Sequence, residues 1–222
     1  EFSSGDGGFS LVGRSAAPVY ARLETRKGRE ELGLDDELSN SMGSDDFNIF
    51  SLRERPGDET SCLNLYRPTE PRILGAPREF IERGGFSWGG TLAANAEEHK
   101  NPWVLLEQTR EGWPAGTVPA IGDLNTVQWI LHSGLGKDVA IKDGRGRDLS
   151  LRIVGLLTNS LLQGSLVVSN RNFEEMFPGR RGWSTFFIES RPGGAESLRG
   201  GLEDQLGRFG LDLQSSGQVL SR

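Results

Sequence analysis

The chain has 222 residues, of which 35% are hydrophobic and 25% are charged, as in folded globular proteins rather than disordered ones. Its formal net charge is −6, and its densest basic run is the pair Arg180–Arg181. Nucleic-acid binding needs a basic surface, so this composition excludes that class of partner. With two histidines and one cysteine, the sequence can form neither a Cys/His metal cluster nor an internal disulfide.

The longest apolar runs, such as Ile153–Leu157, are far shorter than the ~18–20 residues that span a bilayer. The sequence starts at Glu1 and shows no signal peptide. We therefore expect a soluble segment that was processed or excised from a longer protein. The lone Cys62 is expected to be a small buried residue rather than a reactive thiol.

The first half of the chain contains patterns of both element types. The hydrophobic and turn-forming positions predict helices at Ala16–Leu32 and Arg78–Arg83, with Pro77 at the first helical position of the latter. Polar residues predict a mobile loop at Asp35–Asp46 and a linker at Trp88–Pro102. Strands are predicted at Phe9–Val12, Phe47–Arg53, Cys62–Tyr66 and Trp103–Glu107.

The second half contains the clearest local signal, a hairpin of Val139–Lys142 and Leu149–Leu157 around Asp143-Gly144, whose glycine is expected to supply the positive φ. Three helices are predicted, one after Asp123 or Asn125, one from Ser169 to Phe177, and one with apolar residues at helical spacing over 195–209. Short strands are predicted at Val118–Ile121, Leu166–Val168, Phe186–Glu189 and Leu211–Leu213. Helices and strands alternate near both ends while hairpins dominate the middle, which predicts an α+β fold with an inserted β-rich subdomain.

The sequence contains few motifs typical of catalytic, phosphate-binding or metal-binding sites. The sequence has no Gly-x-Ser-x-Gly nucleophile motif, and the glycines near Gly144 lie in a hairpin rather than before a helix, where phosphates bind. His99 is expected in a solvated loop, and His132 at a helix end. The acid pairs Asp35–Asp36, Asp45–Asp46 and Glu97–Glu98 are expected to be solvated. We therefore predict no catalytic residues, no cofactor and no metal.

Aromatic residues beside glycines and prolines are the candidate contacts for a partner or substrate. Aromatic side chains on loops often anchor partners, whereas core packing is the alternative because a tryptophan buries so much area. These candidate contact residues are Phe86, Trp88, Trp103 and Trp113.

The segment Val118–Leu157 resembles the large extracytoplasmic domain of MacB/FtsX-like ABC transporter permeases. It has the strand, the short helix, and a Gly134–Asp138 stretch like the family's "G-x-x-V-G-D", with Gly-Lys-Asp in place of Val-Gly-Asp. The return strand Leu151–Leu157 and the segments Ser165–Phe177 and Thr185–Ser190 resemble the family's later elements. Gly7–Ala17 and Leu63–Gly75 resemble a subgroup with a longer first half, so that the likeness covers most of the chain.

This resemblance implies a MacB-like periplasmic domain between the first and second transmembrane helices of a permease. It implies a membrane-proximal α/β subdomain from residues 1–92 and 184–222 and an inserted β-rich subdomain from 93–183. The implied partners are a cytoplasmic ATP-binding subunit, a second permease copy, identical or different, and the membrane through flanking helices that this chain does not contain.

The leading hypothesis is therefore a non-enzymatic extracytoplasmic domain that transmits ATP-driven motion, or binds substrate or partner proteins outside the membrane. A free-standing secreted module that binds ligands with exposed aromatics is the first alternative. A hydrolase with converging carboxylates is the second.

Overall fold

The computed structural model describes residues 4–57 and 70–221. Ten strands form one mixed sheet in the order β10-β1-β9-β2-β3-β8-β5-β7-β4, with β6 paired to β7. The fold is therefore α+β, as the sequence predicts. The strands are β1 (Leu11–Val19), β2 (Phe47–Arg55), β3 (Arg72–Ala76), β4 (Trp88–Thr91), β5 (Thr117–Asp123), β6 (Asp138–Lys142), β7 (Asp148–Leu157), β8 (Ser165–Ser169), β9 (Trp183–Ser190) and β10 (Leu211–Ser215).

Short helices connect these strands. No helix in the described ranges is long and apolar enough to cross a membrane. The helices are α1 (Arg26–Glu31), α2 (Asp36–Met42), α3 (Arg78–Arg83), α4 (Ala96–Lys100), α5 (Asn170–Met176), α6 (Ala195–Leu206), α7 (Ser216–Leu220), the 3₁₀-helices η1 (Pro102–Glu107) and η3 (Gly207–Phe209), and the π-helix η2 (Thr126–Ile130).

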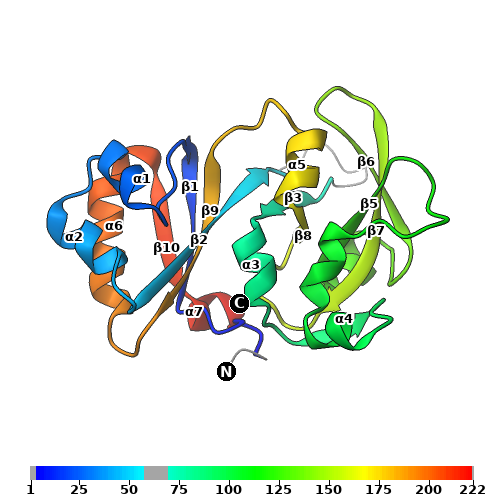
Figure 1. Ribbon diagram of the computed structural model, residues 1–222, viewed down its shortest axis with the longest axis horizontal. Coiled ribbons are helices and arrows are strands. Elements are labelled where there is room, and N and C mark those ends of the chain that lie inside the picture. Colours follow the sequence, from blue (N-terminus) through cyan, green and yellow to red (C-terminus); the bar gives the residue numbers. More distant parts are fainter. Residues whose placement is uncertain (1–3, 58–69, 222) are drawn as a thin grey trace.

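The molecule has two ends that share one sheet. At one end α1, α2 and α6 lie beside β1, β10 and β9, and at the other end α4 and α5 accompany β4–β8 (Figure 1). Strand β2 joins the two ends, because Phe47–Leu52 pairs with β9 while Arg53–Arg55 pairs with β3. A central core of aromatic and aliphatic residues also spans both ends, from Phe9 and Phe187 to Leu74 and Val167.

Helices α1, α2 and α6 cover one face of β1, β9 and β10. Leu11, Ile188 and Leu213 point to this face and pack with Leu198 and Leu202 of α6. The alternation of side chains along a strand sends the intervening residues of β1, β9 and β10 to the opposite face.

Several predicted elements are found at their predicted places. The β6–β7 hairpin, the helix α3, the strand β2 and the helix α5 all form, and Ser169 caps α5 by accepting a hydrogen bond from Asn172 N at 3.3 Å. In the hairpin turn, however, the positive φ belongs to Gly146 and not to Gly144. Asp143 and Arg147 close a five-residue loop instead of a tight two-residue turn.

Other predictions were wrong. Residues 11–19 form β1, so that the helix predicted from Ala16 begins only at Arg26. The predicted loop Asp35–Asp46 contains α2, the predicted linker Trp88–Pro102 contains β4 and α4, and the predicted strand Trp103–Glu107 is the 3₁₀-helix η1. The predicted strand Cys62–Tyr66, and with it the state of Cys62, lies outside the described residues.

Candidate functional site: the chain-end junction

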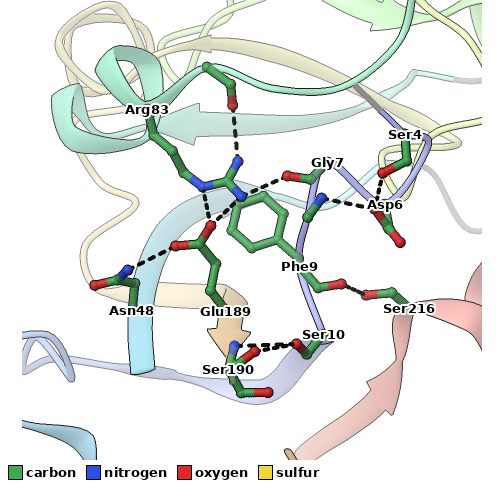
Figure 2. Close-up of polar contacts among 12 residues, drawn as sticks. Ser4, Asp6, Gly7, Phe9, Ser10, Asn48, Arg83, Glu189, Ser190 and Ser216 are labelled. Atoms are coloured by element: carbon green, nitrogen blue, oxygen red, sulfur yellow. Dashed lines mark hydrogen bonds and ion pairs between the residues drawn. The ribbon is translucent and has the colours of Figure 1, made fainter. Parts of the chain in front are cut away.

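The two ends of the chain meet at one place, which we call the chain-end junction: residues 4–10, α7, Asn48, Arg83, Glu189 and Ser190 (Figures 1 and 2). Ser216 Oγ donates a hydrogen bond of 2.5 Å to the carbonyl oxygen of Phe9, and Ser216 N donates one of 3.0 Å to the carbonyl oxygen of Ser10. The start of α7 is therefore tied to the segment that leads into β1.

The short helix α7 is well specified by its own sequence. Ser215 accepts a hydrogen bond from Gln218 N, while the Gln218 side chain accepts one from Ser215 N, which is a capping box. Since this box fixes where α7 begins, it also fixes Ser216 opposite Phe9.

Arg83 is the centre of the junction. Its Nε donates to Glu189 Oε1 at 2.7 Å, its Nη2 to the carbonyl oxygen of Gly7 at 2.6 Å, and its Nη1 to the carbonyl oxygen of Gly84 at 3.0 Å. The guanidinium lies 4.0 Å from the ring centroid of Phe9, a cation–π geometry. Figure 2 shows that this one side chain contacts the N-terminal segment and β9 from the end of α3.

Further bonds extend the junction to β2 and β9. Asn48 Nδ2 donates to Glu189 Oε2 at 3.0 Å, and Ser190 N donates to Ser10 Oγ at 3.2 Å. The side chains of Arg83 and Glu189 are only 9% and 18% exposed, so their ion pair is shielded from water. A displacement of either chain end would therefore act directly on α3 and on the centre of the sheet.

The loop before β8 completes the junction. Leu161 N donates to the carbonyl oxygen of Gly5 at 3.2 Å, and Ser160 N and Oγ donate to the buried carboxylate of Asp123 at 3.1 and 3.0 Å. Asp123 ends β5, so these bonds connect the N-terminal segment to the far end of the sheet.

Two of the aromatic candidates lie inside the central core. Phe86 is 2% exposed and Trp103 is 0% exposed, their ring centroids are 5.6 Å apart, and Trp103 Nε1 donates to the carbonyl oxygen of Gly85 at 3.1 Å. These two side chains are not accessible to a partner in this structure. They pack in the core, which was the alternative interpretation of the aromatic residues.

Trp88 and Trp113 are partly buried. The Trp88 ring contacts Trp103, with centroids 5.6 Å apart, and the Arg152 guanidinium lies 5.0 Å from the Trp113 ring centroid. Contact of either ring with a partner stays a prediction.

The exposed aromatic surface lies elsewhere. Tyr20 is 68% exposed, Trp129 is 73% exposed and Ile130 is 54% exposed. The hydrogen bond from Leu131 N to Thr126 O gives η2 a π-helical turn, in which Val127 is buried and Ile130 is exposed. Three consecutive large apolar residues, Trp129-Ile130-Leu131, were the signal in the sequence, since a short helix cannot bury all three.

One residue of each acid pair has a structural role that the sequence did not predict. Asp35 caps α2 by accepting from Leu38 N at 2.8 Å, and Asp46 pairs with Arg191 at 2.7 Å. Glu98 is buried and accepts from Ala94 N at 2.6 Å, while Arg110 pairs with its carboxylate at 3.0 Å. The hydrogen bond from Ala94 is the main cause that lowers the Glu98 pKa.

Both histidines are exposed, His99 in the last turn of α4 and His132 just after η2. Among the described residues, no three His, Cys, Asp or Glu side chains are grouped so that they could hold a metal ion. The chain-end junction is built from ion pairs and hydrogen bonds.

Comparison with solved structures finds extracytoplasmic regions of ABC transporters along nearly the whole chain. The periplasmic region of MacB from Actinobacillus actinomycetemcomitans is 12% identical, covers 98% of this chain and 93% of its own, and has a TM-score of 0.46. The extracellular domain of the noncanonic ABC-type transporter YknZ from Gram-positive bacteria is 8% identical, covers 92% of this chain and 99% of its own, and has a TM-score of 0.42.

Both solved structures are extracytoplasmic regions of ABC transporters, the class of protein whose pattern the sequence resembles. No protein-family model and no curated protein matches the chain. Because both TM-scores are below 0.5, the function is argued from the geometry of this chain.

Proposed function

We propose that this chain is a non-enzymatic extracytoplasmic domain of an ABC transporter permease, which transmits ATP-driven motion or binds substrate or partner proteins outside the membrane. The observation that carries the proposal is the chain-end junction, where Ser216 of α7 bonds to Phe9 and Ser10 of the N-terminal segment. A domain inserted between two membrane helices must return both ends to the same membrane surface, and side-by-side ends satisfy this requirement.

The contacts of the junction support a role in transmitting motion. Arg83 links Gly7 to Glu189, and Leu161 links Gly5 to the loop that binds Asp123. Each end of the chain is therefore coupled to a different part of the sheet through short polar contacts. In this proposal the flanking membrane helices move the ends, and a cytoplasmic ATP-binding subunit and a second permease copy are the partners.

A membrane-proximal subdomain of residues 1–92 with 184–222, and an inserted subdomain of 93–183, remain part of the proposal. Strands β1, β2, β9 and β10 lie in the first of these ranges. Strands β3 and β4 also lie in it, although they pair with β8 and β7 of the second range. Relative motion of the two subdomains would therefore have to bend the sheet near β2 rather than separate it.

Membrane topology tests the proposal. The parent gene should encode ~20 apolar residues before Glu1 and again soon after Arg222. In the parent protein with Cys62→Ser and Arg145→Cys, a membrane-impermeant maleimide should label intact cells, because Arg145 is exposed in the β6–β7 turn. Labelling that appears only after lysis, or the absence of both apolar segments, would refute the proposal.

A further inference from the structure

A groove of about 390 Å³ lies on the face of β1, β9 and β10 that α1, α2 and α6 leave uncovered. Val12 and Phe187 form its floor, and the loop before β8 and helix α7 close its sides with Leu161 and Val219. Arg72, the first residue of β3, lies in the wall of this groove beside Gln163. The groove therefore combines an apolar floor with the guanidinium of Arg72, and Arg14 and Asp212 also line it.

The charge of Arg72 has no acidic partner at ion-pair distance among the residues that the structure describes. Its Nε donates to Ser165 Oγ at 2.7 Å. Burial is the main cause that lowers the pKa of the Arg72 guanidinium, to about 10, and the guanidinium remains a cation at neutral pH. The charge of Glu54 acts to raise this pKa, but it does not outweigh burial, so an anion in the groove would offset a remaining cost of burying the cation.

The carboxylate of Glu54, whose charge acts on Arg72, already has other partners. Glu54 accepts hydrogen bonds from Arg14 through both of its oxygens, and Thr185 Oγ1 donates to it at 2.6 Å. The Glu54 side chain is only 3% exposed, so it has little room for a further partner. Asp212, on the far rim, accepts from Gln214 Nε2 at 2.9 Å. Arg72 is thus the cation that the fold leaves for a ligand.

We propose that this groove binds an apolar carboxylate, with the carboxylate on the two Nη atoms of Arg72 and the apolar body on Val12, Leu161, Phe187 and Val219. A guanidinium fork matches a carboxylate bidentately, and a single cation suits a monoanion. A fatty acid and the C-terminal residue of a peptide share this chemistry. The inference does not depend on the proposed function, because it uses only contacts within the chain.

Calorimetric titration of the 222-residue chain tests this inference. Sodium octanoate should bind saturably at one site. Acetate, which lacks the apolar body, should bind with an affinity at least about 10-fold lower. Octyltrimethylammonium carries a similar tail with the opposite charge and should not bind. N-acetyl-leucine separates the sources: tighter binding than octanoate assigns the groove to a peptide terminus, and weaker binding assigns it to a fatty acid.

Variants locate the binding. Arg72→Gln should weaken octanoate binding about 10-fold or more, since it removes a charge-assisted hydrogen-bond pair. Arg145→Gln, in the exposed hairpin turn, is the matched control and should leave the affinity within about 2-fold. If Arg72→Gln does not fold, Val219→Ser should weaken octanoate about 3-fold and leave acetate unchanged. Octanoate affinity that is unchanged in Arg72→Gln, or equal binding of octyltrimethylammonium, overturns the inference.

Discussion

The guanidinium of Arg83 lies 4.0 Å from the ring centroid of Phe9 while its Nε donates to Glu189 Oε1 at 2.7 Å. One side chain therefore joins the segment before β1 to the end of β9. These two strands are neighbours in the sheet, and Phe9 also contacts Phe187, with ring centroids 5.1 Å apart. The polar junction and the central core meet at Phe9.

Arg83→Met should destabilise the chain by about 2–3 kcal/mol, because it leaves the shielded Glu189 carboxylate without its cation while keeping an apolar stem. Urea unfolding followed by tryptophan fluorescence measures this. Arg78→Met is the control, since Arg78 pairs with Glu82 on the exposed surface of the same helix, with side chains 76% and 58% exposed. It should cost less than about 0.5 kcal/mol. Equal losses from the two variants would show that the junction contributes no more than a surface pair.

Glycines in different surroundings predict opposite effects of an added methyl group. A Cβ on Gly155 of β7 would come within 2.6 Å of the Trp88 ring, so Gly155→Ala should destabilise the chain by about 1–3 kcal/mol through overpacking. A Cβ on Gly200 of α6 meets no atom within 4 Å, so Gly200→Ala should stabilise it by about 0.5–1 kcal/mol. Thermal unfolding of both variants measures the contrast, and a stabilising Gly155→Ala would mean that Trp88 moves aside freely.

Local signals decide how much of this fold the sequence predicts. The β6–β7 hairpin and α5 were predictable because alternation, a turn and a serine cap lie within a few residues of one another. The prediction over Ala16–Leu32 was wrong at its start because β1 continues to Val19, which pairs with Trp183 of β9. Pro18 lies inside the predicted helix, and a proline disfavours a helix interior because it lacks the backbone N–H.

Neither the junction nor the groove could be predicted in this way. Arg83 and Glu189 lie 106 positions apart in the chain, and Arg72 meets Ser165 from 93 positions away. No local pattern marks any of these residues, because the parallel pairing of β3 with β8 is what brings Arg72 to the groove. For Phe86 and Trp103 the local pattern was misleading. Nearby glycines are typical of loops, although both aromatic side chains are buried in the core.

Lowered carboxylate pKa values predict sensitivity to acid. The Arg152 hydrogen bond lowers the pKa of Asp138, and the Ala94 hydrogen bond lowers that of Glu98. At Asp143 burial acts to raise the pKa, but hydrogen bonds from Arg147 and Arg145 outweigh it and lower the pKa. In each case the unfolded chain binds a proton more readily than the folded one, so the stabilisation is present above the ordinary pKa and is lost as the pH falls.

The loss should begin near the ordinary values, 4.5 for Glu98 and 3.8 for the two aspartates, and continue as the pH falls through the lowered values. Urea midpoints measured between pH 7 and pH 3 should be flat at the upper end and fall at the lower end. Asp138→Asn should reduce the slope at the lower end, because it removes one of the titrating groups. A midpoint that is constant down to pH 3 would contradict the prediction.

Arg72 and Arg83 are both half-buried or buried arginines, yet the structure predicts different outcomes when each becomes methionine. Arg83 has Glu189 as a close counter-ion, whereas Arg72 donates to the Ser165 hydroxyl and has no carboxylate at ion-pair distance among the described residues, although the charge of Glu54 acts on it. Removing a cation whose burial outweighs its favourable charge interactions relieves a desolvation cost, so Arg72→Met should leave the free energy of unfolding unchanged or raise it by about 1 kcal/mol. The same urea experiment measures both variants. A loss of more than about 2 kcal/mol in Arg72→Met would mean that this guanidinium stabilises the fold itself and is not kept for a ligand.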